Sequence, residues 1–264
     1  KKINFQNAHH LVGFLLFFVK IKNLIIGNEM DNQNRNIYYN LELLQAISNW
    51  QAGSNEKKGN KLKELCVNLP EKFRLLPPNL VLFRQISLDN VGLSRFLREK
   101  KLPEKISSWT TDYKFAEKFK GGVPSELGDF KATIFKTTPL NNQVIVSLSE
   151  LYKCSDFCNA MKLNKNKIDR YHDGAGKYWD TQSEVIMATE YLDHSNIYSM
   201  GGYSGTPEQI AEQASREKNI PISLTIDDIK ELSRDYIGPW WLSPEGTRRA
   251  VARTLEIARN RGML

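Results

Sequence analysis

Lys131-Ala-Thr-Ile-Phe-Lys-Thr137 is a short run that contains several β-branched residues, and two similar runs follow it, Val144-Ile-Val-Ser-Leu148 and Glu184-Val-Ile-Met187. Residues of this kind favour strands, and such short runs are typical strand lengths. A fourth run, Leu80-Val-Leu-Phe-Arg84, is apolar and ends in a charge, as expected of a buried strand that delivers one polar side chain to a cleft. We therefore predict strands at all four places.

Helices are predicted before, between and after these strands along the sequence. Apolar residues recur at helical spacing at Ile37, Leu41, Leu44 and Ile47, and Ser243-Pro244-Glu245 is typical of a helix start. The sequence predicts helices over residues 36–50, 61–68, 90–101, 112–120, 209–218, 227–236 and 244–261, a strand over 220–226 and a polar connection over 164–182. This order favours an α+β fold over regular βαβ alternation.

The composition is that of a globular protein. Of the 264 residues, 41% are hydrophobic and 25% are charged, which excludes disordered, collagenous and coiled-coil proteins. The three cysteines, Cys66, Cys154 and Cys158, lack the paired spacing of a zinc site, so we predict no metal and a reducing, cytoplasmic compartment. The net charge of +7 favours an anionic partner, and a solvated basic surface is the alternative.

The first part of the chain contains an apolar segment, Leu11-Val-Gly-Phe-Leu-Leu-Phe-Phe-Val19. No signal-peptide cleavage site follows it, and it is too short to span a bilayer. We therefore expect a buried strand or helix there, no membrane contact of residues 11–26, and Met30 as a candidate internal start. The predicted division is an apolar segment over 1–29, a core with N-terminal helices over 30–205, and a mainly helical extension packed on the core over 206–264.

Common nucleotide-binding and hydrolase motifs are absent, and the remaining candidates for chemistry are polar residues beside predicted strands. Arg84, next to Gln85, could grip a phosphate through two parallel hydrogen bonds, or it could form a structural ion pair. Ser108 and Thr110 point to one side of an extended segment while Trp109 points to the other. These hydroxyls could serve a ligand, or the segment could simply cap the helix that follows.

The third candidate is Tyr178-Trp-Asp-Thr-Gln-Ser-Glu-Val-Ile-Met187. Gln182 and Glu184 project to the same side of a strand. A carboxylate there, oriented by a neighbouring hydroxyl, suits the stabilisation of a positive charge that develops on a sugar. Each of the three patterns is common when it stands alone.

In combination and in this order, the three patterns resemble the Arg-Ser-Glu class of mono-ADP-ribosyltransferases, over about residues 80 to 190. Arg84 matches the family's arginine, Ser108-Trp109-Thr110 its Ser-Thr-Ser motif, and Glu184 its catalytic glutamate. The chain departs from the family at Trp109 and Thr110, which leaves Ser108 as the securer assignment in that motif.

The resemblance implies two small packed sheets that form a cleft for NAD, which is the co-substrate, with no metal. It implies that Arg84, Gln85, Ser108, Trp109 and Thr110 bind NAD. Ser108 is expected to hydrogen-bond Glu184, whose carboxylate would accept from the ribose 2′-OH and stabilise the charge that develops as nicotinamide leaves.

The acceptor of the ADP-ribose is predicted from the position two residues before the glutamate. In this family a Gln there, here Gln182, goes with modification of asparagine or glutamine side chains or of a nucleobase amino group. Tyr178 and Trp179 would contact the acceptor, with Trp179 as a stacking platform for a base, or they would simply pack the loop. We predict a nucleobase in DNA or RNA, with a protein amide as the rival acceptor.

Such an enzyme would be toxic, so we expect a toxin or defence effector that acts in the producing or a target cell and has a neutralising partner. The alternative from a different class is a non-catalytic basic binding module, in which these polar residues are structural and residues 11–26 tether the protein to a membrane.

Overall fold

The computed structural model describes residues 38–123, 130–201, 211–212, 215–216, 219–225, 227, 241–260 and 262. The predicted apolar segment over 1–29 lies outside the described residues, as does nearly all of the predicted helix over 227–236. None of the helices in the described ranges is long and apolar enough to cross a membrane.

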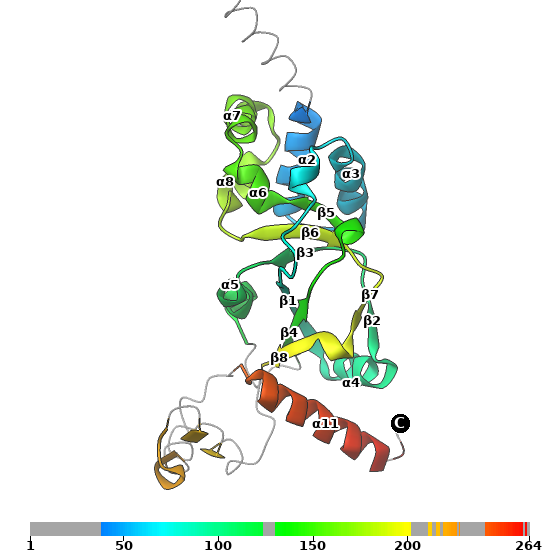
Figure 1. Ribbon diagram of the computed structural model, residues 1–264, viewed down its shortest axis with the longest axis vertical. Coiled ribbons are helices and arrows are strands. Elements are labelled where there is room, and N and C mark those ends of the chain that lie inside the picture. The colour runs from blue at the N-terminus through cyan, green and yellow to red at the C-terminus, as the bar shows by residue number, and fades with distance from the viewer. Residues whose placement is uncertain are drawn as a thin grey trace, which may run out of the picture.

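The fold is mixed α+β, as predicted, and its centre is an antiparallel sheet of six strands in the order β5-β6-β3-β1-β4-β8 (Figure 1). The strands are β1 (Leu82–Asp89), β3 (Ile106–Thr110), β4 (Phe130–Thr137), β5 (Val144–Ser147), β6 (Glu184–Ala188) and β8 (Ile197–Met200). A separate antiparallel pair is formed by β2 (Lys101–Pro103) and β7 (Tyr191–Asp193).

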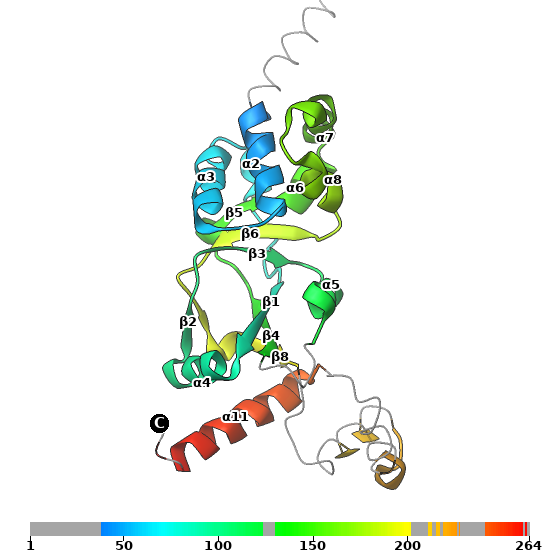
Figure 2. The same cartoon turned by 180° about the vertical axis from the view of Figure 1, so that it is seen from behind.

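The six-stranded sheet has two arms. One arm consists of β5, β6 and β3, and the other of β1, β4 and β8. The strands of the first arm cross the direction of β1 and β4 steeply (Figures 1 and 2). The arms are joined where β1 pairs with β3, through Phe83 and Thr110. The two small sheets that we predicted are therefore two parts of one hydrogen-bonded sheet. Side chains of both arms therefore lie close together where β1 pairs with β3.

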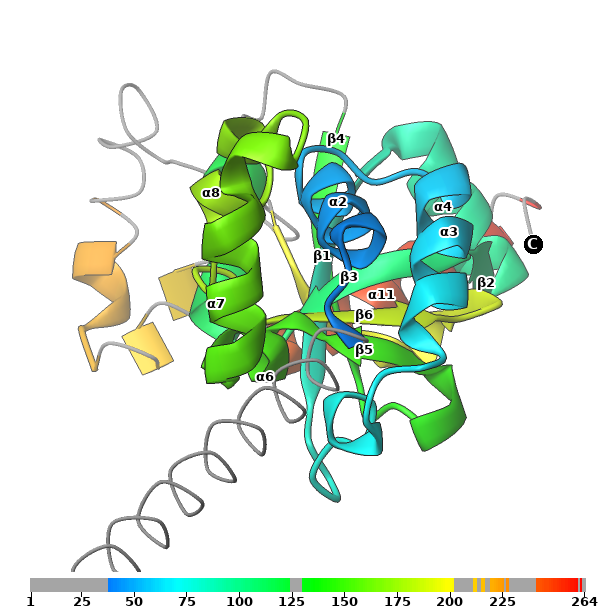
Figure 3. The same ribbon diagram turned by 90° about the horizontal axis from the view of Figure 1, so that it is seen from above.

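One layer of helices covers the arm formed by β5, β6 and β3 (Figure 3). It comprises α2 (Leu41–Gln51), α3 (Glu56–Cys66), α6 (Leu148–Lys153), α7 (Ser155–Asn164) and α8 (Ala175–Tyr178). Alternation along β6 explains the packing, since Ile186 faces this layer while Val185 and Met187 join a second core between the arms. Glu184 lies two residues before Ile186, so its side chain also points to the helical layer.

Other helices lie beside the arm formed by β1, β4 and β8. They are α4 (Asn90–Glu99), α5 (Tyr113–Lys118) and α11 (Pro244–Asn260). Short 3₁₀ helices occur at Glu71–Phe73, Phe119–Gly121, Asn141–Gln143, Lys165–Lys167, Tyr171–Asp173 and His194–Asn196. α11 begins just after Leu242, whose carbonyl accepts from the Ser199 hydroxyl at 2.7 Å, and it holds the Met200 N–H through Thr247 at 3.1 Å.

Three predictions about elements require correction. β1 continues to Asp89 because residues 82–89 pair with β4, so Arg84 is its third residue and not its last. The helices α6 to α8 were missed, the last of them inside the predicted polar connection. The predicted strand over 220–226 is wrong, because Ile222 to Thr225 is helical and the Thr225 N–H bonds the Pro221 carbonyl at 3.2 Å.

Candidate active site

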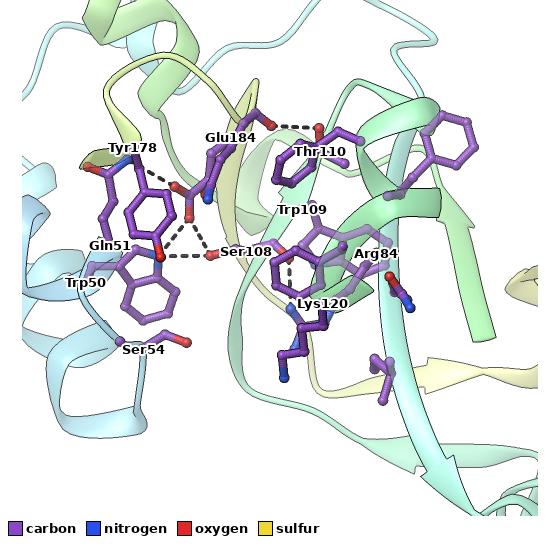
Figure 4. A pocket seen from close by; sticks show the side chains of 18 of the residues that line it. Trp50, Gln51, Ser54, Arg84, Ser108, Trp109, Thr110, Lys120, Tyr178 and Glu184 are labelled. Atoms are coloured by element: carbon purple, nitrogen blue, oxygen red, sulfur yellow. Dashed lines mark hydrogen bonds between the residues drawn. The ribbon is translucent and has the colours of Figure 1, made fainter. Parts of the chain in front are cut away.

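A cleft of about 480 Å³ opens where the two arms of the sheet meet (Figure 4). Its walls come from the end of α2, from β1 and β3, from α5 and from the turn before β6. Five of the predicted site residues that line it belong to β1 and β3: Arg84, Gln85, Ser108, Trp109 and Thr110. Three more, Tyr178, Gln182 and Glu184, come from the segment that leads into β6.

Glu184 and Ser108 meet at the centre of this cleft. The Ser108 hydroxyl donates to Oε1 of Glu184, whose side chain is only 5% exposed. Residues 108 and 184 belong to paired strands, with Ser108 opposite Ile186 and Thr110 opposite Glu184. They share one face because side chains alternate along strands. The predicted hydrogen bond between them is therefore a product of the β3–β6 register.

Trp50, at the end of α2, closes a hydrogen-bonded triangle with these two residues (Figure 4). Its indole N–H lies 2.9 Å from Oγ of Ser108 and 3.0 Å from Oε1 of Glu184. Gln51 follows, with its amide nitrogen 3.5 Å from Oε2 of Glu184, and its oxygen accepts from the Tyr152 hydroxyl at 2.8 Å. Burial raises the pKa of Glu184, and the donors from Ser108, Trp50 and Gln51 oppose that rise.

Arg84, on β1, contacts the backbone of Ser108. Its guanidinium donates to the carbonyl of Ser108 at 2.8 Å and pairs with Glu104 at 3.3 Å. Burial lowers the pKa of Arg84, and the carboxylate of Glu104 opposes this effect. The ion pair that we considered as an alternative role therefore exists. The Nε atom of Arg84 is buried, and no group in the described part of the chain bonds it.

Gln85 and Thr110 order the rim of the cleft. The amide nitrogen of Gln85 donates to the Gly122 carbonyl at 2.9 Å, and its oxygen is buried without a partner among the described residues. The Thr110 hydroxyl donates to the Gln182 carbonyl at 2.7 Å. Thr110 thereby fixes the turn that places Gln182 and Glu184, although it departs from the Ser of the motif.

The two aromatic residues of the predicted acceptor segment lie in different places. Tyr178 lines the cleft, whereas Trp179 is not one of the lining residues. The Trp179 ring packs against Tyr152, with centroids 4.9 Å apart and planes inclined at 38°, next to the core under α6. This is the loop-packing role that we kept as the alternative to base stacking. Trp109 likewise turns its ring into the core, where its N–H bonds Ser107 at 3.1 Å.

Sequence reasoning missed Trp50, Gln51 and Glu104. Trp50 and Gln51 stand in a helix whose apolar spacing indicated only a buried face, and no local motif distinguishes them. The cleft is also lined by Phe115, Phe119 and Lys120, which were not among the predicted site residues.

No group of three or more His, Cys, Asp or Glu side chains in the described ranges could hold a metal ion. Comparison of the chain with models of protein families, with curated proteins and with solved structures finds no match in any of the three.

Proposed function

We propose that this protein is an NAD-dependent mono-ADP-ribosyltransferase with Glu184 as its catalytic residue. The observation that carries the proposal is the meeting of Arg84, Ser108 and Glu184 in one cleft, although they lie far apart in the sequence. A buried carboxylate held by donors and open to a cleft is a typical functional-site arrangement.

The cleft suits a ligand such as NAD in size and in chemistry. Ligand pockets are typically about 300–1,000 Å³, and this one is about 480 Å³. The Nε of Arg84 and the amide oxygen of Gln85, which have no hydrogen-bond partner in the described part of the chain, are a buried donor and a buried acceptor beside it. Lys120 adds a positive charge at the wall, which favours a ligand that carries phosphates.

In the proposed reaction, Glu184 lowers the energy of the positive charge that develops on the ribose as the bond to nicotinamide breaks. The bonding electron pair leaves with the nicotinamide nitrogen. A nitrogen of the acceptor then bonds to C1′ of the ribose and releases a proton to solvent. Ser108 and Trp50 hold the carboxylate, so that it need not reorganise during the reaction.

We propose a nucleobase amino group as the acceptor, with a protein asparagine or glutamine amide as the rival. Gln182 lines the cleft two residues before Glu184, and its neutral amide can both donate to and accept from a base edge or another amide. Tyr178 offers the aromatic surface at this side of the cleft, in place of Trp179. The net charge of +7 favours a polyanionic substrate.

The test is to incubate the protein with NAD labelled in the adenosine part and with either nucleic acid or total cell protein. We expect nicotinamide release and label in nucleic acid, with steep loss of nucleic-acid affinity between low and physiological salt. Label in protein alone would contradict the nucleobase acceptor and favour a protein asparagine or glutamine amide. Absence of nicotinamide release under all conditions would contradict the enzyme and favour a non-catalytic basic binding module.

A further inference from the structure

The Glu184 carboxylate accepts hydrogen bonds from two elements, and only the first of these contacts was predicted from the sequence. The first is Ser108 on the neighbouring strand β3. The second is the C-terminal end of α2, where Trp50 and Gln51 are the last two residues of the helix. Trp50 is buried in the core between α2 and the sheet, and its indole N–H is directed at the carboxylate.

The two oxygens of Glu184 differ in their capacity for further hydrogen bonds. Oε1 accepts from the Ser108 hydroxyl and from the Trp50 indole, which fills the two acceptor positions of a carboxylate oxygen. Among the residues that the structure describes, Oε2 has one hydrogen-bond contact, with Gln51 at 3.5 Å, which is near the limit of a hydrogen bond. Oε2 therefore keeps acceptor capacity, and it belongs to a residue that lines the cleft.

We propose that Trp50 is a positioning residue of this active site, which fixes Oε1 of Glu184 and the Ser108 hydroxyl in one triangle and leaves Oε2 to accept from the ribose hydroxyl. The inference rests on the proposed function. Trp50 itself acts through Glu184 and Ser108. Its ring is rigid, since the side chain is only 2% exposed, so little conformational freedom is lost when the hydrogen bonds form.

Loss of the Trp50 indole N–H should also raise the pKa of Glu184 further. Donors to a buried carboxylate favour its charged form, and burial disfavours it. Without Trp50 as a donor, Glu184 would be protonated up to a higher pH. The titratable and charged groups around it are Tyr152 on α6, whose hydroxyl bonds Gln51, and three groups that line the same cleft: Lys120, Tyr178 and Arg84, which is paired with Glu104.

The decisive experiment removes the N–H and keeps the ring. Trp50 is replaced by 3-benzothienylalanine, which has the same bicyclic shape with sulfur in place of N–H, and Trp50→Phe serves as a second variant. We expect the kcat of nicotinamide release to fall about 10- to 100-fold, as for the loss of a hydrogen bond to a charged group. For the benzothienylalanine variant, the KM for NAD should change less than about threefold, because the deleted N–H is directed at Ser108 and Glu184 and the ring that lines the cleft is kept. The acidic limb of the pH–rate profile should move to higher pH.

Trp241→Phe is the matched control, because its indole N–H bonds the Glu117 carbonyl at 3.0 Å and does not reach Glu184. It should leave the pH–rate profile unchanged. A measurement without turnover complements these rates: the ¹H–¹⁵N resonance of the Trp50 indole should titrate together with Glu184, and Glu184→Gln should abolish that titration.

The outcomes separate the two proposals. If the folded wild-type protein releases no nicotinamide, the proposed function fails and this inference fails with it. If the wild type is active, and the benzothienylalanine variant keeps the wild-type kcat and pH profile, the inference about Trp50 is wrong while the proposed function stands.

Discussion

At the scale of single residues, Glu184 has an ionisable carboxyl group that is almost completely buried yet lines a cleft. Burial of a charge is costly unless donors compensate for it. Three side chains compensate here: Ser108, Trp50 and Gln51. The pKa of Glu184 is nevertheless raised, which means that the fold gives up stability to keep an acid in this position.

This cost predicts opposite effects of Glu184→Gln on activity and on stability. Turnover should fall at least about 100-fold, because a preorganised charge is lost. Between the ordinary and the raised pKa of Glu184 the folded state binds more protons than the unfolded state, so wild-type stability falls as pH rises through this window. The variant lacks this penalty and should gain in thermal stability relative to wild type as pH rises. A variant less stable than wild type at every pH would contradict the interpretation.

Because Arg84 forms an ion pair with Glu104, we predict that the Glu104 carboxylate competes with a phosphate of the ligand for the Arg84 guanidinium. Glu104→Gln should lower the Kd for NAD about two- to fivefold, in line with the modest free energies of such pairs. The measurement is calorimetric titration with NAD at low and high salt. Glu99→Gln is the control, since Glu99 pairs with Arg98 on α4, and it should leave the Kd unchanged. Weaker NAD binding in Glu104→Gln would show that Glu104 supports the binding conformation of Arg84.

At the scale of elements, the position of α2 depends on how closely the segment before β6 can approach it. Gly174 lies against this helix so tightly that an added Cβ would meet the Ser48 carbonyl oxygen at 2.1 Å. Ser48 in turn accepts from the Ala175 N–H at 3.3 Å. The same helix end carries Trp50 and Gln51, so this contact controls the geometry around Glu184.

We therefore predict that Gly174→Ala displaces α2 from the site. It should cost about 1–3 kcal/mol in the free energy of unfolding, which is typical of overpacking, and it should lower kcat as well. Chemical denaturation and nicotinamide release measure the two effects. Gly92→Ala is the control, because its added Cβ meets side-chain atoms only, with Oδ1 of the N-cap residue Asp89 nearest at 2.8 Å, and it should cost less stability than Gly174→Ala and leave kcat unchanged. Wild-type stability and activity of Gly174→Ala would exclude this contact as a determinant of the site.

At the scale of the whole molecule, α11 is joined to the sheet through few hydrogen bonds at its N-terminal end. The Met200 N–H at the end of β8 donates to Oγ1 of Thr247, whose side chain is buried. Trp241 also connects this region to α5, through its hydrogen bond to the Glu117 carbonyl, and α5 forms one wall of the cleft. The C-terminal helix is thereby linked to the arm that carries Arg84.

Removal of one of these hydrogen bonds should destabilise the protein measurably. Thr247→Val keeps the shape of the side chain and leaves the Met200 N–H without its acceptor, at a cost of about 1–3 kcal/mol. Thr254→Val on the exposed side of the same helix removes only a bond to the Ala250 carbonyl and should change stability by less than about 0.5 kcal/mol. Equal effects of the two substitutions in thermal unfolding would mean that α11 does not stabilise β8 in this way.

The α+β class, the strands β1, β4, β5 and β6 and the helices α2, α3, α4, α5 and α11 could be predicted from local patterns. β-Branched runs and apolar spacing reflect how a segment must bury one face, and that requirement acts within a few residues. The same locality explains the errors. The strand expected at 220–226 is helical at Ile222 to Thr225. β1 extends to Asp89 because β4 lies beside it, which no local pattern records.

The candidate site divides in the same way. Alternation along β3 was sufficient to place Ser108 and Thr110 on one face, because side-chain direction in a strand has a period of two. The same reasoning was wrong for Gln182, because β6 begins at Glu184 and Gln182 lies in the turn before it. The register of β3 against β6 was not predictable, and neither was the arrival of Trp50 and Gln51 from a helix more than a hundred residues earlier than Glu184. Hydrogen bonds between distant segments depend on packing of the entire core, and only the folded chain determines which donors reach a buried carboxylate.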